Sequence, residues 1–126
     1  MDRNETKYIT TSIALGASLT AAIPLAQVDS TTNINLNGMR LFGIVMPAAW
    51  TAANLTFQAS ADGTTYSNMY NSDGTELTVT ASTSRYIYLD PAIFASVQFL
   101  KIRSGTAGTP VNQEAARTIG LVLRSV

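Results

Sequence analysis

The chain has 126 residues, with eight Lys/Arg, eight Asp/Glu, and neither cysteine nor histidine. This length is typical of one domain, and the missing residue types exclude disulfides, thiolate metal sites and histidine-based catalysis. Only 13% of the residues are charged, about half the usual share of ~25%. Because binding to phosphates needs a basic surplus, the net charge of zero argues against nucleic acid as a partner. So few charges favour a subunit that packs among other subunits.

Short alternating runs separated by small or polar residues predict a series of strands and no amphipathic helix. In chain order the expected strands cover 7–15, 18–28, part of 29–38, 39–46, 55–60, 66–70, 77–79, 85–89, 97–103 and 117–126. Pro24 assigns the second of these to a sheet edge or a bulge, because proline has no N–H for a ladder. The apolar run 39–46 is expected to be buried on both faces.

The segments between these runs read as turns and loops. Asp62-Gly63 and Asp73-Gly74 are hairpin turn signals, and residues 91–95 predict a single helical turn. Residues 48–53 and 105–110 are expected to be loops, whereas 111–116 remains unassigned. The whole pattern predicts an all-β fold, a jelly-roll-like β-sandwich of two antiparallel sheets with about eight strands. We expect one domain over residues 1–126, with 1–7 as an extended N-terminal arm.

Residues 13–26 form a mildly apolar stretch that could be mistaken for the core of a signal peptide. Threonine, serine and Pro24 interrupt it, and acidic residues offset the basic ones that precede it. We therefore expect a strand here. The stretch is too short and too polar to cross a bilayer, so no membrane partner is expected.

Without histidine or cysteine, catalysis would need carboxylates, Lys, Ser or Tyr. Asp62 and Asp73 could serve as a pair of glycosidase acids, but an aspartate before a turn glycine usually serves the turn itself. One polar stretch could supply oxygen ligands to a calcium ion from Asp29, Asn33, Asn35 and Asn37. The same stretch fits a polar strand and turn better than a calcium site. We expect no catalytic residue, no metal and no cofactor.

Aromatic residues give the chain two candidate binding features. Tyr66, Tyr70, Tyr86 and Tyr88 fit either cross-strand pairs or a stacking platform for sugar or single-stranded nucleic acid, and the lack of interleaved basic residues favours the pairs. Trp50 either anchors an interface or plugs the end of the sandwich. The polar arm fits strand addition to a neighbouring subunit. The interface candidates are Asp2, Arg3, Lys7, Tyr8, Trp50, Thr106, Thr109, Pro110 and Arg124.

Three segments resemble markers of discoidin-like (coagulation factor 5/8 type C) domains. Residues 57–66 (FQASADGTTY) resemble their strand–turn–strand, 85–89 (RYIYL) a following strand, and 117–123 (RTIGLVL) the closing core strand. The resemblance implies a jelly roll from residue 57 onward. The chain lacks the cysteine pair that often closes such domains, and it lacks their loop of aromatic and basic residues for sugar or lipid.

Over its whole length the chain is similar in composition to small virion proteins of tailed bacteriophages, which are free of cysteine, low in charge and rich in Ala, Thr, Ser and Asn. This resemblance implies a non-enzymatic decoration or cement protein on the capsid surface. Its implied partners are the major capsid protein and copies of itself, in a homo-oligomer or a larger assembly. Two alternatives stay open: a carbohydrate-binding sandwich module, and a tail or connector component of a virion.

Overall fold

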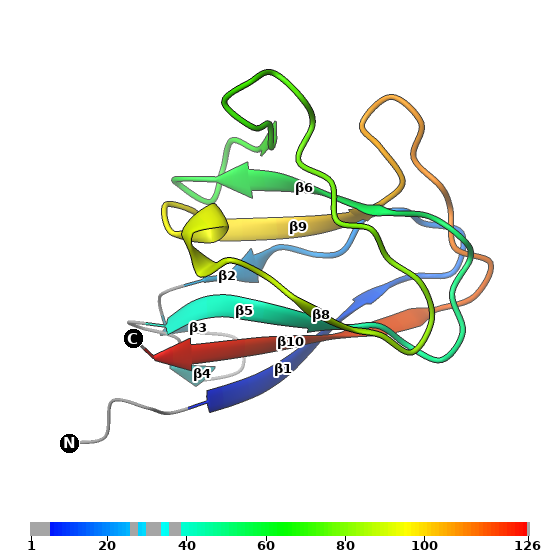
Figure 1. Cartoon of the computed structure of the whole chain (residues 1–126), viewed down its shortest axis with the longest axis horizontal. Coiled ribbons are helices and arrows are strands. Elements are labelled where there is room, and N and C mark those ends of the chain that lie inside the picture. Colours follow the sequence, from blue (N-terminus) through cyan, green and yellow to red (C-terminus); the bar gives the residue numbers. More distant parts are fainter. Residues whose placement is uncertain (1–5, 26–27, 30–33, 36–38, 126) are drawn as a thin grey trace.

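The computed structural model describes residues 6–25, 28–29, 34–35 and 39–125 (Figure 1). Two antiparallel sheets of four strands face each other, which confirms the predicted all-β sandwich. Sheet A contains, in spatial order, β1 (Thr6–Ile13), β10 (Arg117–Ser125), β5 (Met39–Val45) and β8 (Tyr86–Tyr88). Sheet B contains β2 (Ile23–Pro24), β9 (Phe99–Ser104), β6 (Leu55–Ser60) and β7 (Ser67–Asn68). A separate pair joins β3 (Val28–Asp29) and β4 (Ile34–Asn35).

The order of the strands is that of a jelly roll. Counted along the chain without the β3–β4 pair, strands one, eight, three and six form sheet A, and strands two, seven, four and five form sheet B. Each of the first four strands therefore lies beside one of the last four, as in a long antiparallel hairpin rolled into two layers. This topology brings the beginning of β1 beside the end of β10, where Thr6 is opposite Arg124.

The core lies between the sheets because alternate residues of each strand point inward. From β10 the inward residues are Ile119, Leu121 and Leu123, all completely buried. Phe57 of β6 is completely buried and meets the ring of Phe94 edge to face at 5.2 Å. Phe94 belongs to a 3-10 turn, η1 (Pro91–Phe94), which confirms the predicted single helical turn.

Several strands are shorter than the sequence predicts. β2 is limited to two residues at the edge of sheet B, where Pro24 has no N–H to donate. Residues 77–79 form no strand, since Leu77 makes one main-chain hydrogen bond to Met69 and Val79 forms only an isolated antiparallel bridge with Leu55. β5 is fully buried on its inward face but only half-buried at Arg40, Phe42 and Val45, so the expected burial on both faces is incomplete.

Candidate functional site

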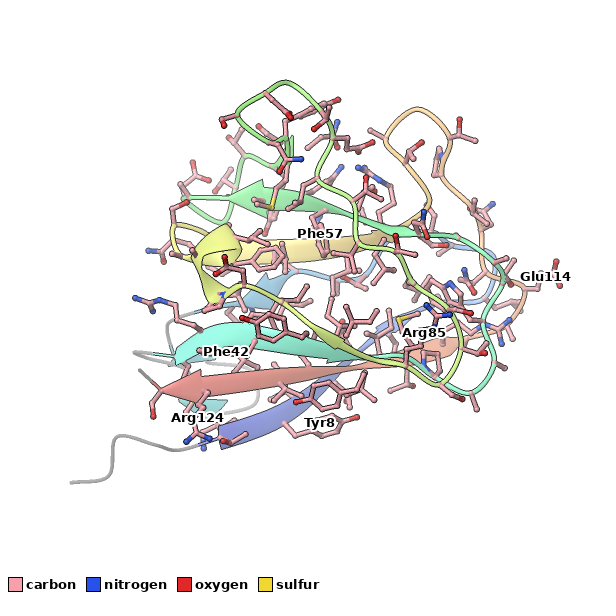
Figure 2. The ribbon with its side chains drawn as sticks, in the orientation of Figure 1. Tyr8, Phe42, Phe57, Arg85, Glu114 and Arg124 are labelled. Atoms are coloured by element: carbon pink, nitrogen blue, oxygen red, sulfur yellow. The ribbon has the colours of Figure 1, made fainter. Side chains whose placement is uncertain are left out.

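Sheet A has an outer face, turned away from sheet B, that carries exposed aromatic side chains. The strand register aligns its residues in two rows that cross all four strands. One row is Tyr8, Val122, Gly43 and Tyr88, and the next is Thr10, Gly120, Val45 and Tyr86. We call these two rows the tyrosine face. Tyr8 lies on the side of β1 and β10 that faces away from sheet B (Figure 2).

Two of these tyrosines lie across glycines of the neighbouring strand. A side-chain carbon built on Gly120 would fall 2.6 Å from both Cε1 and Cζ of Tyr8. A carbon built on Gly43 would fall 3.0 Å from Cε1 of Tyr86. Both glycines are buried although they point outward, because the rings cover them. Each edge strand thus folds one ring inward over a glycine of the neighbouring strand.

The tyrosine face is exposed and contains no charged residue in either row. The exposed fractions of Tyr8, Tyr86 and Tyr88 are 60%, 68% and 75%. The adjacent row is cationic: Arg124 lies opposite Arg40 and donates from Nη1 to Oγ1 of Thr6 at 2.9 Å. Tyrosine and arginine are the side chains most often found as anchors of protein interfaces.

The tyrosine candidates do not form one cluster. Tyr86 and Tyr88 belong to sheet A, whereas Tyr66 and Tyr70 flank β7 of sheet B. The ring of Tyr66 is half-buried beneath Lys101, whose Nζ lies 4.3 Å from the ring centroid. A platform of all four is therefore not formed. Tyr86 and Tyr88 instead share the tyrosine face with Tyr8, which the sequence indicated only as an interface candidate.

Trp50 is half-buried and packs against the core, and its Nε1 donates to the carbonyl of Ala53 at 3.0 Å. This is the geometry of a plug at the end of the sandwich. Its loop is held by Gln113, of which only 1% is exposed. The Gln113 amide accepts from the backbone N–H of Thr51 at 2.8 Å and donates to the Thr51 carbonyl at 3.0 Å. An interface role for Trp50 remains a prediction.

The interface candidates Thr106, Thr109 and Pro110 lie on an exposed loop that projects from sheet B (Figure 1). The loop closes through the backbone N–H of Thr106, which donates to Thr109 at 3.1 Å. It begins at Gly105, whose φ of 92° places it in the left-handed region. A side-chain carbon there would lie 2.6 Å from the Thr109 carbonyl oxygen, so only glycine fits.

The base of this loop carries a largely buried ion pair, which the strand pattern of the sequence does not reveal. Arg103 is only 6% exposed, although it lies on the face of β9 turned away from the core. Its Nη2 lies 3.0 Å from Oε2 of Glu76, and its other nitrogens donate to Thr56 and Asn68. Glu76 also accepts from the backbone N–H of Ala107. The pair therefore joins the 69–80 segment to the 105–110 loop.

Asp62 and Asp73 serve their turns. The Asp62 carboxylate accepts from the backbone N–H groups of Thr65 and Thr64 and from the Ser60 hydroxyl, and these bonds lower its pKa. The hydroxyl and N–H of Thr75 lower the pKa of Asp73 in the same way. Both carboxyls are exposed and engaged in local hydrogen bonds, which is the structural role expected from the sequence.

Other candidates lie partly outside the described residues. Asp2 and Arg3 of the arm do so, as do Asn33 and Asn37 of the calcium alternative. Lys7 is half-buried on β1. Among the described residues, no three acidic, histidine or cysteine side chains gather closely enough to hold a metal ion. Nor does this part of the chain contain a helix with the length and hydropathy needed to cross a bilayer.

Comparison with known proteins gave no match to a family model, to a curated protein or to a solved structure. The resemblances to discoidin-like domains and to phage virion proteins therefore remain predictions.

Proposed function

We propose that this chain is a non-enzymatic structural subunit of a bacteriophage virion, in which it decorates or cements the capsid. The tyrosine face supports this role, because three exposed tyrosines lie in two uncharged rows beside Arg40 and Arg124. A soluble monomer usually keeps such aromatic surface small or scattered. The jelly roll is also common among viral capsid domains, which is an argument from fold alone.

The proposed mechanism is passive. The tyrosine face binds the major capsid protein, and each bound copy stabilises the assembled shell by mass action. The tyrosines supply buried area at the centre, and the two arginines favour a partner surface that presents carboxylates at its rim. The carboxyls of Asp62 and Asp73 are engaged by their own turns, which supports a role without catalysis.

Purified virions of the phage that encodes the chain provide the test. Quantitative mass spectrometry is expected to find the chain in many copies per particle, and immunogold labelling is expected to locate it on the head. Virions that lack the chain would contradict the structural role altogether. Labelling confined to the tail or connector would contradict the capsid assignment.

A carbohydrate-binding role is the second candidate, and the geometry of Tyr8 and Tyr86 favours it. Each ring has a glycine behind it and solvent in front, so that its free face is open to stacking by a sugar ring. A glycan array probed with the whole chain tests this role. Binding that is lost in Tyr86→Ser would support it, and an array without signal would contradict it.

A further inference from the structure

The four sheet edges differ in how well they are protected against pairing with another strand. β2 is two residues long and contains Pro24, β7 is two residues long, and β8 is three. Short edges and prolines are the usual means of preventing edge-to-edge association. β1 has neither protection: it runs for eight residues, without glycine or proline and with Lys7 as its single charge. No described strand pairs with its edge remote from β10.

We propose that β1 pairs antiparallel with β1 of a second copy, so that two A sheets join into one continuous sheet of eight strands. This inference shares with the proposed function only the premise that the chain assembles into a larger structure. A two-fold axis perpendicular to the sheet generates such a pair, and the same strand then serves both partners. Because the net charge of the chain is zero, two copies do not repel each other through their overall charge.

The alternation of β1 restricts the register of this pair. Its exposed residues are even-numbered, whereas the odd-numbered ones face sheet B. Directly opposed residues in an antiparallel pair share a face of the sheet. The residue numbers of two opposed residues must therefore add up to an even sum, and this sum defines the register. A sum of 18 places Ile9 opposite Ile9 and Tyr8 opposite Thr10 of the second copy. A sum of 20 would place Lys7 opposite the completely buried Ile13, which is unfavourable for a charge.

The favoured register also separates the positive charges. Lys7 lies opposite Thr11 of the second copy, and the two lysines are about 14 Å apart along the strand direction. On the outer side the two tyrosine faces become continuous across the axis. Four strands span about 19 Å and eight span about 38 Å, at about 4.8 Å per strand. The dimer would therefore present twice the width of tyrosine face to a capsid.

Cysteine cross-linking tests the register, because the natural chain has no cysteine. In the proposed pair, the Cα atoms of residue 9 are about 4.5–5.5 Å apart, within reach of a disulfide. Ile9→Cys is expected to give a covalent dimer under mild oxidation. Ser12→Cys is the matched control, since the two Ser12 residues would be about 20 Å apart. Cross-linking of Ser12→Cys but not Ile9→Cys would overturn the register.

Charge variants at Thr11 provide a second, non-covalent test. Thr11→Lys creates two like-charge pairs, because each new lysine lies opposite Lys7 of the other copy, and it is expected to weaken the dimer by about tenfold. Thr11→Glu creates two opposite-charge pairs and is expected to strengthen the dimer. Sedimentation velocity of the whole chain at increasing concentration measures both. A wild-type chain that stays monomeric at every concentration would overturn the inference, as would equal dimerisation of the two variants. A chain that dimerises through β1 yet is absent from virions would support this inference and contradict the proposed function.

Discussion

The ring of Tyr8 on β1 covers Gly120 on β10, two residue pairs away along the ladder. The direct partner of Tyr8 is Val122, and Gly120 pairs with Thr10, so the ring leans diagonally across the strand. Tyr86 covers Gly43 in the same diagonal manner from the opposite edge of the sheet. Glycine weakens a strand because it packs no side chain, and an aromatic ring across it restores the contact. The tyrosine face is thus part of the sheet's stability as well as its surface.

Gly120→Ala is expected to destabilise the fold by about 1–2 kcal/mol, because the new methyl group displaces the Tyr8 ring. In a Tyr8→Ala background the same substitution is expected to stabilise by about 0.5–1 kcal/mol, since alanine suits a strand better than glycine. Urea unfolding of the four proteins gives the double-mutant cycle. The same sign of effect in both backgrounds would contradict the contact.

The buried pair of Arg103 and Glu76 is expected to matter more for stability than an exposed salt bridge. Glu76→Ala leaves the Arg103 guanidinium buried without its carboxylate and is expected to cost about 3–5 kcal/mol. The double variant Arg103→Met/Glu76→Leu removes both charges and is expected to cost clearly less. Denaturant unfolding measures each, with the exposed Glu114→Ala as control. A cost for Glu76→Ala no greater than that of Glu114→Ala would refute this role.

Alternation in the sequence was sufficient to predict the architecture and much of the core. Ile119, Leu121 and Leu123 occupy alternate positions of the predicted strand 117–126, and all three are buried in the sandwich. The long strands β1, β5, β6 and β10, predicted from alternation or from a continuous apolar run, match the structure to within a few residues. Where few ladder bonds form, as at residues 77–79, an alternating pattern alone could not tell a strand from an extended loop.

The tyrosine face could not be predicted in the same way, because it depends on strand order. Tyr8 and Tyr88 are far apart in the sequence and share a row only because β1 and β8 flank the same two central strands. The buried state of Arg103 has a similar origin. Arg103 lies within a predicted strand, but its burial depends on residues 69–80, which cover it only in the folded chain.

The hydrogen bonds to Asp62 imply a pH-dependent contribution to stability. Its pKa in the folded protein lies below the ordinary value, since the N–H groups of Thr65 and Thr64 stabilise the charged form. The contribution is complete above the unfolded pKa, about 3.9, and is lost as pH falls through the lower folded value. NMR titration of the side-chain carboxyl is expected to give a pKa below that of Asp62 in the unfolded chain. An equal or higher pKa would contradict the hydrogen-bond geometry.

Gln113→Ala is expected to destabilise the fold by about 3 kcal/mol and to loosen the loop that carries Trp50. The substitution removes the hydrogen-bond partner of the Thr51 backbone groups and of Nε of Arg117. Because Trp50 is the only tryptophan, its fluorescence reports directly on this loop. The exposed neighbour Asn112→Ala is the control. Unchanged emission and stability in Gln113→Ala would show that the loop is held by other contacts.

The most direct test of the account is binding to empty shells assembled from the major capsid protein of the phage that encodes the chain. The measurement compares the wild type, Tyr86→Ser/Tyr88→Ser, and Tyr70→Ser, which changes an exposed tyrosine outside sheet A. We expect saturable binding that the double variant weakens by at least about tenfold and Tyr70→Ser leaves unchanged. No binding by the wild type, or equal binding by both variants, would contradict the tyrosine face as the docking surface.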